Sequence, residues 1–279
     1  MGSPVTQIVA LLGKPLRRRH SVVMHNAAFA AAGIDGRYEL MEIDEDDVAR
    51  VVAEARAGDD WLGLGVTAPY KRLVASLVDE VEPEATLIGA VNNVVRTPDG
   101  RLVGFNTDAP GFRAGAELAM GAPLAGRHVV IAGAGGVARA IVFACQQAGV
   151  ASLTIGNRSL PASVAGISAV ALDGPDFAAA LRSADLAVNA TTVGMIDPGM
   201  TFRVEDLPAG ATVFDCVYVP AETPLLAAAR ARGLRAANGS EMLIAQAAAA
   251  FERWTGVSGM ADVMRAAVAP LLADPTARA

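Results

Sequence analysis

Apolar runs of strand length alternate with helical patterns along most of the chain. In the first third, three predicted strands alternate with three predicted helices, at residues 7–12, 21–32, 37–43, 46–56, 62–66 and 70–78. This alternation is typical of parallel sheets covered by helices. Ser21 is expected to cap the first of these helices, because a serine hydroxyl can accept hydrogen bonds from the free N–H groups of the first turn.

A second series of strands and helices follows a predicted hairpin at 92–96 and 102–105 and a helix at 108–120. Its strands are expected at residues 127–132, 152–155, 168–172, 186–189 and 212–215. The chain reads as helical after Asn238 and is expected to return to the first domain. We therefore predict an α/β protein of two domains. The first is a discontinuous parallel-sheet domain of residues 1–107 and 239–279, and the second is a Rossmann-type domain of residues 108–238.

Composition and charge exclude several classes of protein. The formal net charge is −6, without a basic stripe that would suit nucleic acid. The longest apolar runs, such as residues 129–134, are too short to cross a bilayer. Cys145 and Cys216 make neither a disulfide framework nor a metal site, so no metal is expected. These features predict a cytoplasmic enzyme, monomeric or homodimeric, that acts on a small molecule and has no membrane partner.

A glycine-rich turn joins the apolar strand at 127–132 to the helix predicted at 136–148. In this context such a turn indicates a dinucleotide site, because its glycines permit a tight turn and the helix N-terminus can hold a pyrophosphate. The expected cofactor-binding residues of the turn are Gly133, Ala134, Gly135, Gly136, Val137 and Ala138.

The end of the next strand favours NADP over NAD. An NAD site places an acidic residue there to bind the ribose hydroxyls. Here the strand at 152–155 is followed by Gly156, Asn157, Arg158 and Ser159, with no acid among them. Arg158 can pair with a 2′-phosphate, and its two polar neighbours can donate hydrogen bonds.

Lys71 and Asp108 are the candidates for proton transfer. Lys71 is one of only two lysines in the chain, and lysine can give up its proton whereas arginine cannot. It follows a predicted strand end within Gly65-Val66-Thr67-Ala68-Pro69-Tyr70-Lys71, and Asp108 follows another within Asn106-Thr107-Asp108. A lysine beside an aspartate could donate a proton to a carbonyl that receives a hydride. The spacing alone does not show that the two side chains meet.

In these motifs the sequence resembles the shikimate dehydrogenase family, and the resemblance extends over nearly the whole chain. Matching motifs occur in order at residues 65–71, 89–93, 106–108, 133–139, 157–159, 189–191, 194–195, 215–218, 223–226, 242–247 and 254–256. The resemblance implies an NADP-dependent oxidoreductase of aromatic amino acid biosynthesis that interconverts a carbonyl and an alcohol. It also implies that Lys71 and Asp108 are the catalytic pair. Its implied substrate-binding residues are Ser21, Arg19, Thr67, Asn92, Tyr218 and Gln246, and it adds Thr191 and Met195 to the cofactor site.

The departures from the family pattern lie mostly among the substrate-facing positions. Arg19 replaces a carboxylate-binding serine, and Arg18 replaces the histidine before it. Gly65 replaces an asparagine and is expected to leave space in the substrate pocket, while Asn93 replaces a threonine. Ala162 stands where the family has a second NADP-binding arginine. We therefore predict a diverged substrate pocket with Arg19 at its centre.

Two alternative functions remain open at this stage. The substrate could be quinate, an amino analogue or another small carboxylate, because the changes cluster in the pocket while the catalytic pair is retained. The chain could also be a non-catalytic paralogue that binds a nucleotide or metabolite, although the retained Lys71 and Asp108 argue against this.

Overall fold

The computed structural model describes residues 6–16, 19–160, 162–195 and 197–273. The chain folds into two compact units. Unit 1 comprises Met1–Thr107 and Gln246–Pro270, and unit 2 comprises Asp108–Ala245 and Leu271–Ala279. The first boundary lies between Thr107 and Asp108, whereas the return to unit 1 lies inside helix α9 rather than before it.

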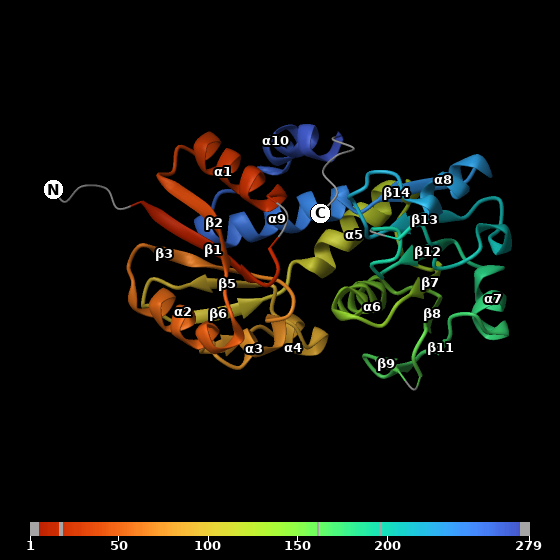
Figure 1. The fold of residues 1–279 in the computed structure, drawn as a ribbon, viewed down its shortest axis with the longest axis horizontal. Coiled ribbons are helices and arrows are strands. Elements are labelled where there is room, and N and C mark those ends of the chain that lie inside the picture. The colour runs from red at the N-terminus through yellow and green to blue at the C-terminus, as the bar shows by residue number, and fades with distance from the viewer. Residues whose placement is uncertain (1–5, 17–18, 161, 196, 274–279) are drawn as a thin grey trace. The chain divides into compact units, whose positions relative to one another are not determined.

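Unit 1 is built on a six-stranded sheet in the order β2-β1-β3-β5-β6-β4 (Figure 1). The strands are β1 (Gln7–Gly13), β2 (Gly36–Glu42), β3 (Trp61–Val66), β4 (Glu80–Val81), β5 (Asn93–Arg96) and β6 (Leu102–Phe105). The predicted hairpin of β5 and β6 is confirmed. Strand β5 is also antiparallel to β3, so this hairpin makes the sheet mixed, while β1, β2 and β3 pair in parallel and β4 pairs in parallel with β6.

The reversed strand β5 gathers three chain segments at one edge of the sheet. Gly65 near the end of β3 pairs with Asn93 at the start of β5, and Asn93 pairs with Phe105 at the end of β6. An antiparallel strand begins where its neighbours end. Polar residues just outside these strand ends are therefore brought close together, which positions the candidate site described below.

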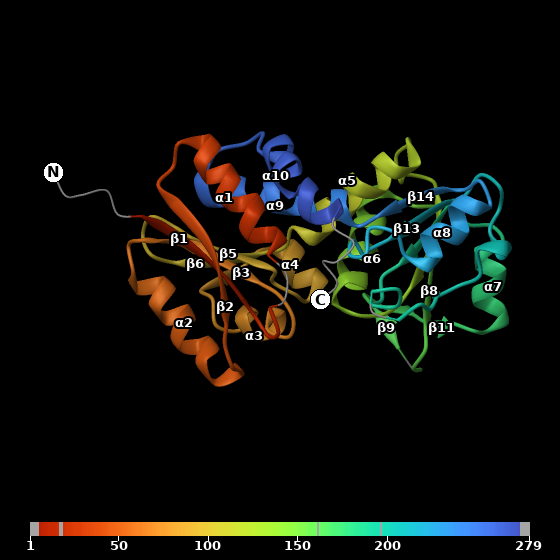
Figure 2. The same ribbon diagram turned by 45° about the horizontal axis from the view of Figure 1, so that its top comes forward.

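Helices cover both faces of the unit 1 sheet (Figures 1 and 2). They are α1 (His20–Ala32), α2 (Glu45–Ala57), α3 (Lys71–Ala75), α4 (Pro83–Ile88), α9 (Ser240–Thr255) and α10 (Ala261–Ala273). On one face, Phe29 of α1 packs edge-on against Phe251 of α9, with ring centroids 5.0 Å apart. On the other face, the valines of α2 are buried in a cluster with Leu12 and Leu64. Trp254 ties α9 to the sheet by donating to the carbonyl of Val94 at 2.9 Å.

Two local predictions in unit 1 were wrong. Helix α1 begins at His20, so Ser21 lies inside the helix and does not cap it. The side chain of Ser21 instead hydrogen-bonds Tyr38, a contact with another element that local sequence does not reveal. Helix α3 ends at Ala75, short of the predicted Val78. The next residue, Ser76, donates its hydroxyl proton back to the carbonyl of Leu73, which competes with helix continuation.

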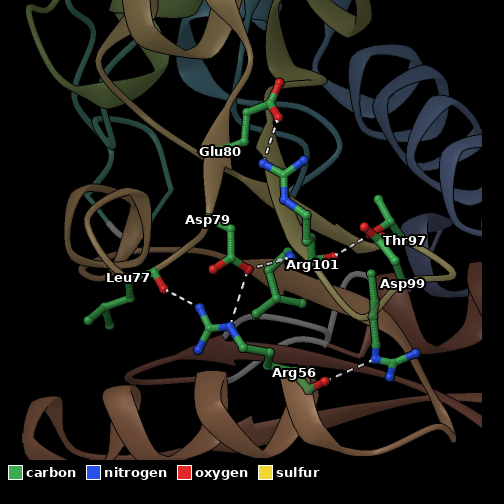
Figure 3. A network of polar contacts seen from close by, with 9 residues as sticks. Arg56, Leu77, Asp79, Glu80, Thr97, Asp99 and Arg101 are labelled. Atoms are coloured by element: carbon green, nitrogen blue, oxygen red, sulfur yellow. Dashed lines mark hydrogen bonds and ion pairs between the residues drawn. The ribbon is translucent and has the colours of Figure 1, made fainter.

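A polar network joins the end of α2 to the β4 and β6 edge of the sheet (Figure 3). Arg56 donates to the carboxylate of Asp79 at 3.2 Å and to the carbonyl of Leu77 at 2.8 Å. The same carboxylate accepts the backbone N–H of Leu102 at 2.8 Å. The Leu102 N–H and the Arg56 guanidinium together hold the pKa of Asp79 below its usual value. The network lies apart from the strand ends at which the candidate site residues gather.

Unit 2 is built on a parallel six-stranded sheet in the order β11-β8-β7-β12-β13-β14. The strands are β7 (His128–Ala132), β8 (Ser152–Asn157), β11 (Val170–Ala171), β12 (Leu186–Asn189), β13 (Thr212–Asp215) and β14 (Arg235–Asn238). Counted from β7, this order is 3-2-1-4-5-6, the order of dinucleotide-binding Rossmann folds. The predicted α/β class with a Rossmann-type part is confirmed.

The helices of unit 2 pack on both faces of its sheet (Figure 1). The main helices are α5 (Asp108–Met120), α6 (Gly136–Ala148), α7 (Pro175–Leu181) and α8 (Pro224–Ala231), and the short elements are β9 (Ser163–Val164), β10 (Ile167–Ser168) and the 3-10 helix η1 (Val204–Asp206). Phe177 of α7 and Leu225 of α8 share a buried cluster with Val213. The next strand residue, Phe214, instead meets Phe112 of α5 edge-on at 5.6 Å. Successive strand residues therefore point to opposite helical layers.

No helix among the described residues is long and apolar enough to span a membrane.

Buried His25 is expected to make the stability of the protein depend on pH. Its ring stacks on Tyr38 at 4.4 Å and lies 5.2 Å from the ring of Trp254, and burial lowers its pKa to about 3. The unfolded chain therefore binds a proton near pH 6.5 that the folded chain binds only near pH 3. The free energy of unfolding should fall as pH is lowered between these values, by at most about 1.4 kcal/mol per pH unit from this group.

The measurement is urea unfolding of the wild type and of His25→Phe between about pH 7 and pH 4, a window that covers most of that titration range. Phenylalanine keeps a stacked ring and cannot be protonated, so the variant should show a shallower loss of stability on acidification. Parallel pH profiles for the two proteins would contradict the assignment.

Candidate active site

The glycine turn between β7 and α6 has the geometry of a phosphate-binding turn. Gly133 has φ +111°, and a Cβ added there would lie 2.8 Å from Cγ2 of Thr191. Any larger residue would therefore be strained by its backbone and would clash. Its N–H donates to the carbonyl of Gly156 at 2.7 Å, which places the turn against the end of β8.

The next two glycines leave open space at the N-terminus of α6. A Cβ built at Gly135 or Gly136 meets nothing within 4 Å, and both residues are exposed. Helix α6 begins at Gly136 without a side-chain cap, so its first N–H groups face this space. Ala138 is fully buried, as expected for a small residue where the helix meets the sheet. These residues fit a pyrophosphate group.

The end of β8 lies beside this turn, since Ala132 pairs with Gly156. Asn157 is the last residue of β8, and its side chain donates to the carbonyl of Ser159 at 2.8 Å. Arg158 is exposed and makes no ion pair with any residue that the structure describes. Its guanidinium is thus available to an anion next to the glycine turn, which is what a 2′-phosphate requires.

A buried polar network shapes the loop that contains Thr191 and Met195. The side-chain oxygen of Asn189 accepts the backbone N–H of Thr191 at 3.0 Å and its hydroxyl at 2.7 Å. The amide nitrogen of Asn189 donates to the carboxylate of Asp215 at 2.8 Å. Met195 closes a turn by donating its N–H to the carbonyl of Thr192. The loop is therefore held by the strand ends of β12 and β13.

Asn189 and Asp215 were not among the predicted site residues, although both lie in motifs that match the family. The carboxylate of Asp215 also accepts from the hydroxyl of Thr223 at 2.7 Å. Burial raises the pKa of Asp215, while the hydrogen bonds from Thr223 and Asn189 oppose that rise. A polar residue at the end of a buried strand is the sequence signal that could have indicated this role.

Two predicted residues of unit 1, Thr67 and Lys71, follow the end of β3, and a third, Asn92, directly precedes β5. Thr67 comes directly after β3 and donates its backbone N–H to the carbonyl of Leu12 at 2.9 Å. Lys71 is the first residue of α3 and is half-buried. Its carbonyl accepts the N–H of Val91 at 3.1 Å, which holds Lys71 next to the segment that carries Asn92.

Asn92 and Gln246, both predicted to face the substrate, are connected through Thr107. The N–H of Thr107 donates to Oδ1 of Asn92 at 2.9 Å, and Nδ2 of Asn92 donates to the hydroxyl of Thr107 at 3.1 Å. The hydroxyl of Thr107 donates to Oε1 of Gln246 at 3.4 Å. Asn93 joins the same group, because its Nδ2 donates to both Asn92 and Thr107 at 2.9 Å. Thr107 was not among the predicted site residues, because the prediction from this motif considered only its acidic neighbour, Asp108.

Ser21 and Arg19 lie at the start of α1. Ser21 is half-buried, and its side chain bonds the hydroxyl of Tyr38. Arg19 is exposed and stands at the N-cap position without a side-chain capping bond. The neighbouring Arg17 and Arg18, the latter predicted to replace a family histidine, lie outside the described residues.

The space expected beside Gly65 is filled, so that prediction was wrong. A Cβ at Gly65 would lie 2.6 Å from the hydroxyl of Tyr38 and 3.1 Å from Cδ1 of Leu11. The rigid ring of Tyr38 is 4 % exposed and packs against His25. Restoring the family's asparagine at position 65 would therefore require Tyr38 to move.

Asp108 and Tyr218 belong to unit 2. Asp108 is buried at the start of α5, and Tyr218 lies two residues beyond Cys216 after β13. Burial, Asp215 and then Asp108 raise the pKa of the Cys216 thiol, which shows that Asp108 lies near this strand end. The pairing of Lys71 with Asp108 stays a prediction. Among the described residues, no group of three or more His, Cys, Asp or Glu side chains could hold a metal ion.

Comparison with known proteins identifies the family. The family model described as the shikimate dehydrogenase substrate binding domain matches residues 11–94. The model described as the shikimate 5′-dehydrogenase C-terminal domain matches residues 239–269. Both matches support the resemblance drawn from the motifs.

Individual relatives extend the similarity over nearly the full length. A shikimate dehydrogenase (NADP(+)) of Symbiobacterium thermophilum is 42% identical over 285 residues, which cover 96% of each chain. The shikimate 5-dehydrogenase of Thermus thermophilus, solved with NADP(H) and shikimate, has a TM-score of 0.84 and 36% identity over 95% of this chain and 99% of that one. A quinate dehydrogenase of Corynebacterium glutamicum, solved with NAD, has a TM-score of 0.86 and 33% identity over 95% and 99%. The chain belongs to the shikimate dehydrogenase family.

Proposed function

We propose that this protein is an NADP-dependent shikimate dehydrogenase, which interconverts the alcohol shikimate and the corresponding ketone. The observation that carries the proposal is the open glycine turn beside the acid-free end of β8, where Arg158 is exposed. The names of the relatives support the same cofactor and substrate.

In this proposal, side chains of the protein carry out the proton transfer of the reaction. When bound, the reduced cofactor supplies a hydride to the carbonyl carbon. Lys71 donates a proton to the carbonyl oxygen, and in the reverse direction it accepts the hydroxyl proton. Asp108 orients Lys71 and stabilises its charged form. Asn92, Thr67, Tyr218, Gln246 and Ser21 bind the ring substituents and the carboxylate.

The proposal is tested by initial rates of NADP or NAD reduction with shikimate, quinate and related acids. It predicts that shikimate with NADP gives the highest kcat/KM of the set. Absence of turnover with every acid would favour the non-catalytic alternative.

Replacing Lys71 by alanine should remove nearly all turnover. General acid–base groups contribute on the order of 10²–10⁴-fold in rate, so kcat should fall by about this factor while the Kd for NADP changes little. Asp108→Asn should behave similarly. The matched control is Lys14→Ala, which removes the other lysine, one that pairs with Asp44 at 2.5 Å. A Lys71→Ala kcat within about threefold of wild type would exclude Lys71 as the proton donor, since that change is far below this range.

Replacing Arg158 by alanine should weaken the binding of NADP and leave the binding of NAD nearly unchanged. A charge-assisted contact to the 2′-phosphate contributes roughly 1.5–3 kcal/mol, so the Kd for NADP should rise about tenfold or more. Fluorescence titration of both cofactors measures the change, with Arg182→Ala as an exposed arginine control in the same unit. The NADP assignment is wrong if the wild type binds the two cofactors equally well.

A second candidate is that another small carboxylate is the preferred substrate. The observation that favours it is Arg19, whose exposed guanidinium precedes Ser21 where the family pattern has a serine. A guanidinium can bind a carboxylate through two hydrogen bonds, whereas a serine offers one donor. Quinate is the first alternative to test, since a quinate dehydrogenase shares this fold.

Under this candidate, Arg19→Ser should raise the kcat/KM for shikimate and lower that for the alternative acid. The change is made alone, because Gly65→Asn would displace Tyr38. Arg37→Ser replaces an exposed arginine of β2 that pairs with Glu39 and serves as the control. Wild-type turnover of shikimate at about 10⁴ M⁻¹s⁻¹ or better, the lower end of ordinary enzyme efficiency, would rule the candidate out.

A further inference from the structure

Asn93 is a buried polar residue that the proposed reaction does not use directly. Its side chain is 4 % exposed, and it stands at the start of β5, opposite Gly65 and Phe105. Its amide nitrogen lies 2.9 Å from both Oδ1 of Asn92 and Oγ1 of Thr107. The two protons of one amide group can therefore serve two different acceptors.

The orientation of both amides follows from a backbone group. The N–H of Thr107 can only donate, so the atom of Asn92 that it meets at 2.9 Å must be the oxygen. Asn93 faces that same oxygen and must therefore present its nitrogen. Distinguishing oxygen from nitrogen in a side-chain amide depends on such a network, and here the backbone decides it.

The protons around the Thr107 hydroxyl also determine the orientation of Gln246. The hydroxyl of Thr107 accepts one proton from Asn92 at 3.1 Å and one from Asn93 at 2.9 Å. A hydroxyl has two acceptor positions and one proton, so its own proton remains for Oε1 of Gln246, 3.4 Å away. Gln246 thus turns its oxygen toward Thr107 and its Nε2 away from it.

We propose that Asn93 is a positioning residue for Gln246: its N–H occupies the second acceptor position of the Thr107 hydroxyl, so that Gln246 turns its oxygen toward Thr107 and presents an N–H donor to an acceptor oxygen of the substrate. The inference rests on the proposed function, in which Asn92 and Gln246 bind shikimate. A threonine at position 93 has one hydroxyl proton and could serve only one of the two acceptors. Because this chain has asparagine where the family pattern has threonine, both of these acceptors receive a proton from the side chain of residue 93.

The kinetic test compares Asn93→Asp and Asn93→Thr with wild type. An ionised aspartate keeps the shape of asparagine but can only accept, so the Thr107 hydroxyl would donate to it and would no longer hold the oxygen of Gln246. The KM for shikimate should rise about tenfold in Asn93→Asp, as expected for a lost or reversed hydrogen bond, and less in Asn93→Thr. The KM for NADP should stay within about twofold, because the lost interaction belongs to substrate binding alone.

The control for a purely structural effect is Asp79→Asn, which weakens the network of Figure 3 in the same unit. Its melting temperature is matched to that of the Asn93 variants by adding urea. We expect this control to lose as much stability as the Asn93 variants while its KM for shikimate stays unchanged. A KM for shikimate within about twofold of wild type in Asn93→Asp would overturn the inference, as would an equal rise for substrate and cofactor.

Neutron diffraction from perdeuterated wild-type crystals tests the same inference without substrate or turnover. The expected map has both deuterons on Nδ2 of Asn93 directed at Asn92 and Thr107, and the Thr107 hydroxyl deuteron directed at Gln246. A Gln246 amide that donates to Thr107 would contradict the inference even if shikimate is the substrate. The expected map, together with a wild type that does not turn over shikimate, would retain the hydrogen-bond pattern and reject the proposed function.

Discussion

The hydrogen bond from the backbone N–H of Thr107 to Oδ1 of Asn92 joins the segments at which the candidate substrate-binding residues of unit 1 meet. It joins the start of β5 to the segment that leaves β6, where the strands are already paired through Asn93 and Phe105. Because the donor belongs to the backbone, the orientation of Asn92 is set by the fold rather than by a neighbouring side chain. A buried amide group held in this way loses little freedom when a ligand binds.

In unit 2 the backbone also determines the geometry of the candidate site, here through a glycine turn. The positive φ of Gly133, and the clash that a Cβ there would make with Thr191, admit no larger residue, whereas Gly135 and Gly136 face open space. The first glycine therefore shapes the turn, and the next two expose N–H groups at a helix start that favours anions. Arg158 adds a cation at the neighbouring strand end.

Much of the fold could be predicted because its signals are local. The helices at Asp108–Met120 and Gly136–Ala148 and the strand at His128–Ala132 agree with the sequence pattern to within a residue. Strand β14 was missed because Arg235–Asn238 is a short edge strand without an apolar run. The filled space beside Gly65 depends on Tyr38, which reaches it from another strand, and no local pattern encodes such a contact.

The most direct test of the central claim is a crystal structure of the complex with NADP and shikimate. The account predicts that Nζ of Lys71 lies within hydrogen-bond reach, about 2.6–3.2 Å, of the hydroxyl that is oxidised. It also predicts that Arg158 contacts the 2′-phosphate and that Nε2 of Gln246 faces the substrate. A complex in which Lys71 is directed away from that hydroxyl, with another side chain in its place, would contradict the account.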